Sequence, residues 1–222
     1  MVIIYIFFMR IIIMMICVSF GFCGFEGAFL GVGLGAQHST QTLGGDALAL
    51  FNPSEKGRPH TRLGGHIKLL GGHSNRFDHW YMGGELFAII PFHQNSTKRE
   101  GTQCQGSTLY QRGWSLGLTP RLGFIICQKV LVFTKFGIEI SRDYMEWSNT
   151  GTLRPGYYEG RKKTLLGVIV GGGCEVCMSD HINLRFDYGY HSTRTLGDTL
   201  NNMKMTLKRH AHMYNMALVY QF

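Results

Sequence analysis

The chain has 222 residues, of which 16% are charged, well below the roughly 25% that is usual for soluble domains. Its 30 glycines exceed the usual share, but 5 prolines and 45% hydrophobic residues exclude a disordered or collagen-like chain. The formal net charge of +8 comes from scattered basic residues without a nucleic-acid-binding motif, so we expect no nucleic-acid partner.

The N-terminus contains the one stretch that is apolar and long enough to suggest a membrane-spanning helix, which excludes a polytopic helical membrane protein. Arg10 precedes a compact apolar run at 11–18, and small residues follow around Cys23, as in a secretory signal peptide. We therefore expect a cleaved signal peptide at 1–23, with Met9 as a possible true start, and a mature domain at 24–222. An uncleaved membrane anchor is the alternative.

Beyond residue 24, apolar residues recur at every second position, which is the period of a β-strand. The pattern predicts about eight strands, each long enough to cross a bilayer when tilted. Clear alternation is found in 28–35, 114–123, 134–141, 182–191 and 212–222, and weaker alternation in 61–72, 79–91 and 163–176.

The second face of these strands combines glycine with charged residues, and this combination argues against a soluble barrel or sandwich. On a solvent-facing surface glycine would weaken the strands, whereas inside a small barrel it relieves crowding between opposite charges. We therefore predict an all-β fold, an eight-stranded antiparallel up-and-down transmembrane β-barrel with its apolar face toward lipid. The charged residues of the inward face are Lys68, Glu85, Arg121, Lys135, Glu139, Arg185 and Asp187.

The connections between the predicted strands alternate between long and short, as in bacterial membrane barrels with long external loops and short periplasmic turns. Both termini then lie on the periplasmic side. The expected long connections are 39–60, 92–111, 143–161 and 194–208, and the expected short turns are 73–78, 126–129 and 177–181.

Three segments resemble the eight-stranded outer-membrane barrels of the OmpA/OmpX type, which include the opacity-like surface proteins. They are EGAFLGVGLG near the start, GGGCEVCMSDHINLRFDYGY at 171–190, and YNMALVYQF at the end. The resemblance implies a multi-pass protein of the cell outer membrane. It also implies that the last strand carries a signal for the outer-membrane assembly machinery, formed by Met216, Leu218, Tyr220 and Phe222.

The inward charges resemble the interior salt-bridge cluster of such barrels, which fills the lumen. The members of this expected cluster are Glu85, Arg121, Lys135, Glu139, Arg185 and Asp187. An unpaired charge inside a barrel is costly, so we expect these six residues to satisfy one another. A gate over a narrow conductive path is the alternative function of the same cluster.

The cysteines and histidines do not predict a metal site or a cofactor. Cys127 and Cys177 lie in short turns that flank two paired strands, so we expect a disulfide between them, which non-reducing peptide mapping would test. Cys174 and Cys177 lack a second ligand pair at zinc spacing. His210 and His212 share one face near the outer rim, where an interfacial role is expected, because two ligands do not make a metal site.

We therefore expect a non-enzymatic protein with a structural or surface-interaction role, and with host, cell-surface or lipid ligands. A narrow pore is the first alternative. The second is a lipid A-modifying enzyme resembling the deacylases, with His191 as base, Thr193 or Ser192 as nucleophile and Asp198 as acid. Basic residues near the external strand ends suit the phosphates of lipopolysaccharide, and these are Lys98, Arg99, Arg161, Lys162, Lys163, Lys208 and Arg209.

Overall fold

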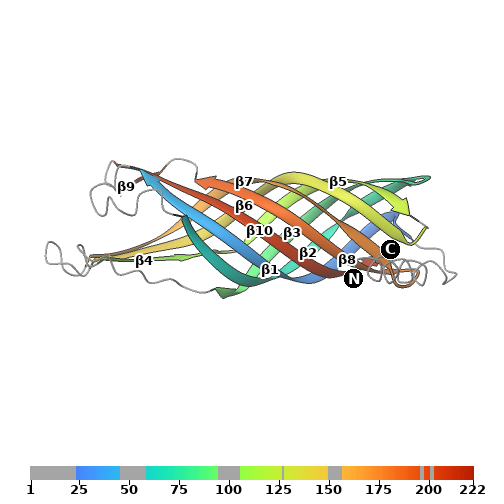
Figure 1. The fold of residues 1–222 in the computed structure, drawn as a ribbon, viewed down its shortest axis with the longest axis horizontal. Coiled ribbons are helices and arrows are strands. Elements are labelled where there is room, and N and C mark those ends of the chain that lie inside the picture. Colours follow the sequence, from blue (N-terminus) through green and yellow to red (C-terminus); the bar gives the residue numbers. More distant parts are fainter. Residues whose placement is uncertain are drawn as a thin grey trace, which may run out of the picture.

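The computed structural model describes residues 24–45, 59–94, 106–126, 128–149, 157–195, 198–200 and 203–222, in which ten β-strands form one sheet (Figure 1). Every pairing in this sheet is antiparallel. The strands are β1 (Gly27–Gly45), β2 (Pro59–Phe77), β3 (Trp80–Gln94), β4 (Gly106–Gln111), β5 (Ser115–Ile126), β6 (Val130–Asn149), β7 (Tyr157–Cys177), β8 (Ile182–Thr195), β9 (Asp198–Leu200) and β10 (Met203–Gln221).

The sheet closes into a barrel because β1 pairs with β10 as well as with β2. Eight strands form the wall in the order β1–β2–β3–β5–β6–β7–β8–β10, which confirms the predicted eight-stranded antiparallel fold. The short strand β4 pairs with β6 and continues the line of β5, and β9 pairs with the start of β10. Closure leaves no free sheet edge in the wall, as a lipid environment requires.

All the short turns lie at the end of the barrel where β1 begins and β10 ends, since Phe29 pairs with Gln221 (Figure 1). The first turn joins β2 to β3 through Asp78, whose φ of 56° is a left-handed conformation that aspartate tolerates. At the other end the strands run further than predicted. β6 continues to Asn149 and β7 begins at Tyr157, where a connection at 143–161 was expected. The apolar alternation stops before the backbone hydrogen-bond ladder does.

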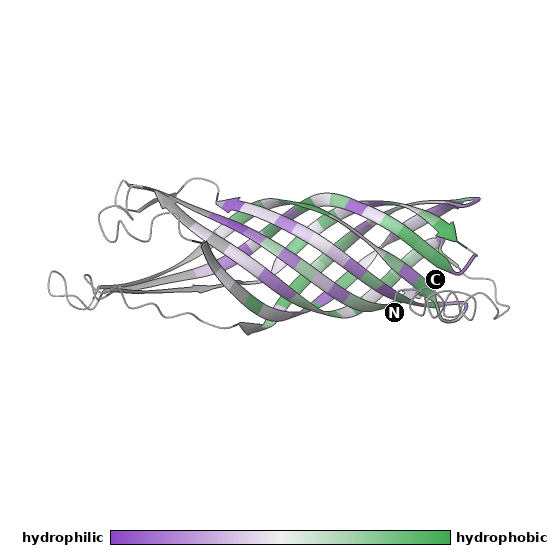
Figure 2. Ribbon diagram, in the orientation of Figure 1, coloured by the Kyte–Doolittle hydropathy of each residue, from purple (hydrophilic) through white to green (hydrophobic). Residues whose placement is uncertain are grey.

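The two faces of the strands differ as predicted: apolar side chains are exposed on the outside and the charged side chains are buried inside. Hydrophobic and hydrophilic residues accordingly alternate along the strands (Figure 2). On β10, Leu218 is 56% exposed, whereas its neighbour Val219 is 1% exposed. The same contrast separates Val168, which is exposed, from Ile169, which is buried. Within the described ranges, no helix is both long and apolar enough to span a membrane.

Apolar side chains also fill two parts of the interior. Near the short turns, Tyr81, Ile125, Leu131 and Phe133 pack around Phe25, which lies just before β1. We call this group, Phe25 included, the apolar floor of the barrel. A second cluster lies farther along the lumen and contains Phe29, Leu70, Phe87, Ile89, Ile169, Ala211, Met213, Ala217 and Val219. An eight-stranded barrel has an interior just wide enough for side chains, and the two clusters contribute to filling it.

Candidate functional site

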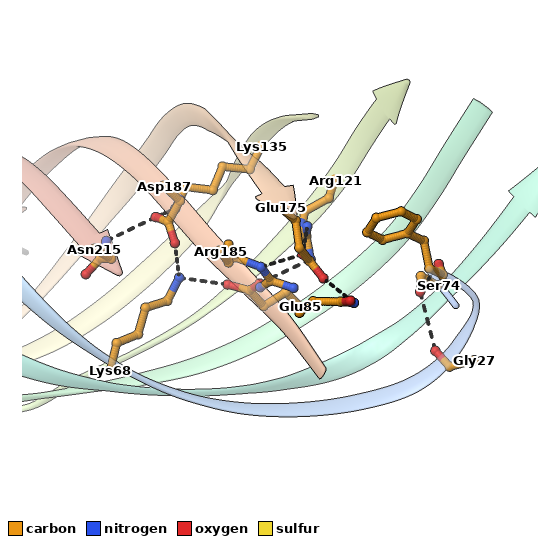
Figure 3. A network of polar contacts seen from close by, with 12 residues as sticks. Gly27, Lys68, Ser74, Glu85, Arg121, Lys135, Glu175, Arg185, Asp187 and Asn215 are labelled. Carbon is orange, nitrogen blue, oxygen red and sulfur yellow. Dashed lines mark hydrogen bonds and ion pairs between the residues drawn. The ribbon is translucent and has the colours of Figure 1, made fainter. Parts of the chain in front are cut away.

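Charged side chains from most strands of the wall meet inside the barrel in a first cluster on the side of the short turns. We call it the turn-side network; it consists of Lys68, Glu85, Arg121, Lys135, Glu175, Arg185 and Asp187 (Figure 3). Each of these residues is buried, with at most 6% of its surface exposed. The lumen therefore contains a connected chain of buried, oppositely charged side chains.

Glu85 is the centre of the turn-side network. Its carboxylate accepts hydrogen bonds from Lys68 Nζ at 2.9 Å and from Arg185 Nη1 at 2.5 Å. Arg121 Nη1 lies 3.6 Å from the same carboxylate. Because β3 contributes Glu85 whereas β2, β5 and β8 contribute its three cationic partners, this one side chain ties four strands together.

The remaining acids complete the turn-side network (Figure 3). Glu175 accepts from Arg185 Nε at 2.7 Å and from Arg121 Nη2 at 3.2 Å. Asp187 pairs with Lys135 and with Lys68, the latter at 3.2 Å. Asn215 also donates to Asp187, at 3.0 Å, so β10 is linked to the cluster as well.

Two arginines of this network, Arg121 and Arg185, lie against aromatic rings of the apolar floor. The guanidinium carbon of Arg121 lies 4.0 Å from the ring centre of Phe133 and 5.1 Å from that of Tyr81. The guanidinium carbon of Arg185 lies 5.8 Å from the ring centre of Phe133. Aromatic faces attract cations, so the floor stabilises the excess positive charge of a network with four cations and three acids.

A second cluster lies farther from the turns, and we call it the loop-side network: Arg112, Glu139, Asp143, His191 and Arg209. Glu139 accepts from Arg112 at 2.8 Å and is bonded to His191 Nδ1. Arg209 donates to Asp143 at 2.6 Å and approaches Glu139 at 3.5 Å. All five side chains are buried, so the lumen is crossed by charge pairs at two levels.

A β-bulge brings Arg112 into the loop-side network. Gln111 pairs with Tyr144 and Ser115 pairs with Ser141, so the three residues between β4 and β5 lie opposite two residues of β6. The extra residue reverses the alternation, and Arg112 therefore points inward although it is even-numbered like the outward-facing Leu116 and Leu118. The backbone N–H of Gly113 donates to Asp143 and fixes the bulge.

The structure buries all six residues of the expected charge cluster in the lumen but divides them between the two networks. Glu139 belongs to the loop-side network and the other five belong to the turn-side network. Sequence reasoning did not include Glu175, Arg112, Asp143 and Arg209 in the cluster. For Glu175 the signal was present, because it occupies an inward position in the weakly alternating segment 163–176.

Arg209 was expected to contact lipid at an external strand end, and the structure shows that this expectation is wrong. It is fully buried and paired with Asp143 inside the barrel, because its odd-numbered position on β10 is an inward one. Lys208, its neighbour, is exposed on the outer wall. The side chains of the other expected lipid ligands, Lys98, Arg99, Arg161, Lys162 and Lys163, lie outside the described residues.

Two residues of the enzymatic alternative, His191 and Thr193, face the lumen. His191 is 3% exposed and bonded to Glu139, and Thr193 is 2% exposed. Asp198 has no described side chain. A base and a nucleophile buried inside the barrel do not meet lipid, in which the scissile bond of an acyl-chain substrate lies.

The sulfur and imidazole groups do not form a metal site within the part of the chain that the structure describes. Cys177 is disulfide-bonded and Cys174 is a free thiol. The expected partner, Cys127, lies outside the described residues, so the Cys127–Cys177 pairing stays a prediction. The backbone supports it, because the N–H of Cys177 donates to the carbonyl of Lys129, two residues from Cys127, at 2.9 Å.

A closed antiparallel barrel with an apolar outer wall and a charge-filled lumen defines the class of transmembrane β-barrels of bacterial outer membranes. The chain belongs to the OmpA-like transmembrane domain family, whose model matches residues 96–222. The protein is therefore an eight-stranded barrel of the cell outer membrane, as the sequence resemblance predicted. A search of curated proteins found no match.

Several solved structures resemble the fold. Neisserial surface protein A has 14% sequence identity and a TM-score of 0.41, with 89% of this chain and 100% of that chain covered. The attachment invasion locus protein Ail of Yersinia pestis has 16% identity and a TM-score of 0.37, covering 86% of this chain and 99% of that one. The outer membrane protein OprG of Pseudomonas aeruginosa has 10% identity and a TM-score of 0.42, with 91% and 100% covered.

Proposed function

We propose that the protein is a non-conducting, non-enzymatic surface barrel, whose wall is a rigid support for external segments that contact host, cell-surface or lipid ligands. The observation that carries this proposal is the filled lumen. Five carboxylates and six Lys or Arg side chains pair across it in the two networks. Removing one partner of a buried ion pair costs about 3–5 kcal/mol, so these pairs oppose any widening of the barrel.

The apolar floor adds a second obstacle to ion flow. Phe25 is 1% exposed, and its carbonyl accepts a hydrogen bond from Ser74 Oγ at 3.0 Å. The carbonyl of Glu26 accepts from Gln221 Nε2 at 2.8 Å. The segment before β1 is thus part of the barrel, which supports a mature domain at 24–222 and a signal peptide whose removal leaves Phe25 in the chain.

The last strand supports a contact with the outer-membrane assembly machinery. Met216, Leu218 and Tyr220 alternate on the outer wall, each at least 46% exposed, and Phe222, two residues further on, is 66% exposed. β10 also closes the barrel against β1. We propose these four side chains as the assembly signal.

A narrow pore is the alternative function, and the orphaned polar atoms of the lumen favour it. His66 Nδ1, Thr119 Oγ1 and Thr193 Oγ1 are buried without hydrogen-bond partners among the described residues, which are positions that a water molecule would satisfy. A hydrated path past the two networks would conduct ions only if the ion pairs rearranged.

Current recordings from single barrels in planar lipid bilayers separate the two functions. The wild-type protein, folded before insertion, is expected to produce no unitary current steps, because buried charge pairs block the lumen at two levels. An unfolded sample provides the control for leakage of the bilayer itself. Steady, reproducible conductance steps from the folded protein would contradict the proposal and support the pore.

A further inference from the structure

The outer wall carries a cluster of tyrosine and histidine side chains on three adjacent strands, β8, β10 and β1. Tyr188 Oη lies 2.7 Å from His212 Nδ1, and Tyr190 Oη lies 2.8 Å from His210 Nδ1. The rings are also stacked: the planes of Tyr190 and His210 make an angle of 11°, with centroids 5.9 Å apart. His38 on β1 faces His212 at 6.3 Å. We call these five residues the Tyr–His belt.

The position of the belt along the barrel follows from the strand register. Residues paired in register across β8, β10 and β1 form rows on the outer wall. From the short turns toward the opposite end, the side chains of successive rows are first apolar, then aromatic, then imidazole and finally cationic. The rows are Phe186–Met216–Leu34, Tyr188–Tyr214–Ala36, Tyr190–His212–His38, Ser192–His210–Thr40 and Arg194–Lys208–Thr42. The belt therefore lies at the external boundary of the apolar wall, where aromatic girdles meet lipid headgroups.

We propose that the belt is a binding site for the phosphorylated headgroup of outer-leaflet glycolipid, the diphosphorylated lipid A part of lipopolysaccharide. The proposal requires the tautomer in which Tyr188 and Tyr190 donate their hydroxyl hydrogens to the Nδ1 atoms that they contact, those of His212 and His210. In that tautomer each ring carries a proton on Nε2, because an imidazole nitrogen that accepts a hydrogen bond is not the protonated one. The two Nε2–H groups have no acceptor among the described residues and are available to phosphate oxygens.

The positive charge of the neighbouring row favours an anionic ligand. Lys208 and Arg194 are paired in register one row farther out and are both exposed. Two imidazole N–H donors and two cations on one wall match a dianionic headgroup at the membrane surface, and hydrogen bonds to charged acceptors are the strong ones. The outer leaflet presents such headgroups to this end of the barrel, whereas the same wall near the short turns faces the inner leaflet.

The site rests on the lipid contact included in the proposed function, but it is independent of the sealed lumen. Its residues lie on the outer wall, and their substitution leaves both interior networks intact. Lipid binding and conductance are therefore separate measurements, so a failure of one proposal is distinguishable from a failure of the other.

The test is a lipid titration of the folded, full-length protein in neutral detergent micelles, with bound lipid counted by native mass spectrometry. The probes are diphosphorylated lipid A, monophosphorylated lipid A and phosphatidylglycerol. The double variant His210→Phe/His212→Phe keeps aromatic rings but removes both N–H donors. It is expected to bind diphosphorylated lipid A at least about tenfold more weakly than the wild type, the effect of one charge-assisted hydrogen bond or more.

The matched control is His73→Phe, an exposed outward histidine on β2 near the short turns, which is expected to bind lipid A like the wild type. Wild-type affinity for the double variant would overturn the proposal, as would equal wild-type affinities for phosphatidylglycerol and lipid A. If the double variant does not fold, imidazole nitrogen NMR of the wild type decides. Protonated Nε2 on both His210 and His212 supports the site, and protonated Nδ1 contradicts it.

Discussion

Glu85 forms ion pairs with three cationic side chains in the lumen. Its carboxylate faces Lys68, Arg121 and Arg185. All four residues are buried, with at most 3% of their surface exposed to solvent. Period-two alternation was enough to expect Glu85, Arg121 and Arg185 inside the barrel. The partner of each charge was not predictable, because it depends on the tilt of the strands and on how far each side chain reaches across the lumen.

We expect Glu85→Gln to lower the free energy of unfolding by about 3–5 kcal/mol, because three buried cations lose their shared counter-charge. Equilibrium urea unfolding of the protein folded in lipid vesicles measures this change. The control is Glu26→Gln, which neutralises an exposed glutamate just before β1 and is expected to have little effect. Equal stability of the two variants would show that the turn-side network contributes little to folding.

At the scale of the element, the junction of β4 and β5 departs most from a regular strand. The bulge at Arg112–Trp114 adds one residue against β6, and the backbone N–H of Arg142 donates to the carbonyl of Trp114 at 3.0 Å. A period-two pattern cannot reveal such a bulge, since it interrupts the period itself. For this reason Arg112 was not among the expected interior residues, whereas Arg121 on the regular part of β5 was.

Gly113 is required by this bulge, because a Cβ atom there would lie 1.6 Å from the carbonyl oxygen of Arg142. We expect Gly113→Ala to destabilise the barrel by about 1–3 kcal/mol, the usual cost of overpacking. Gly84 is the matched control, since an added Cβ there has no heavy atom within 4 Å. The temperature at which each variant loses its folded mobility on SDS gels compares the two. Unchanged heat stability of Gly113→Ala would contradict the role of the bulge.

For the whole molecule, the alternation of residues together with the alternation of connection lengths was sufficient to predict an eight-stranded outer-membrane barrel. The strand ends were not predictable, because beyond the lipid the ladder continues on polar residues without an apolar face. β6 and β7 remain paired as far as Asn149 and Tyr157. The division of the interior into two charge networks was equally hidden, since it arises from the stagger between strands and not from any single strand.

The central claim is that one face of each strand touches acyl chains and the other fills a closed interior. Methyl-labelled protein in lipid nanodiscs tests it directly through nuclear Overhauser contacts with acyl-chain protons. Adjacent residues are internal controls: Leu218 and Val168 are expected to show contacts with lipid, while Val219 and Ile169 are expected to show none. Lipid contacts at Val219 and Ile169, with none at Leu218 and Val168, would contradict the account.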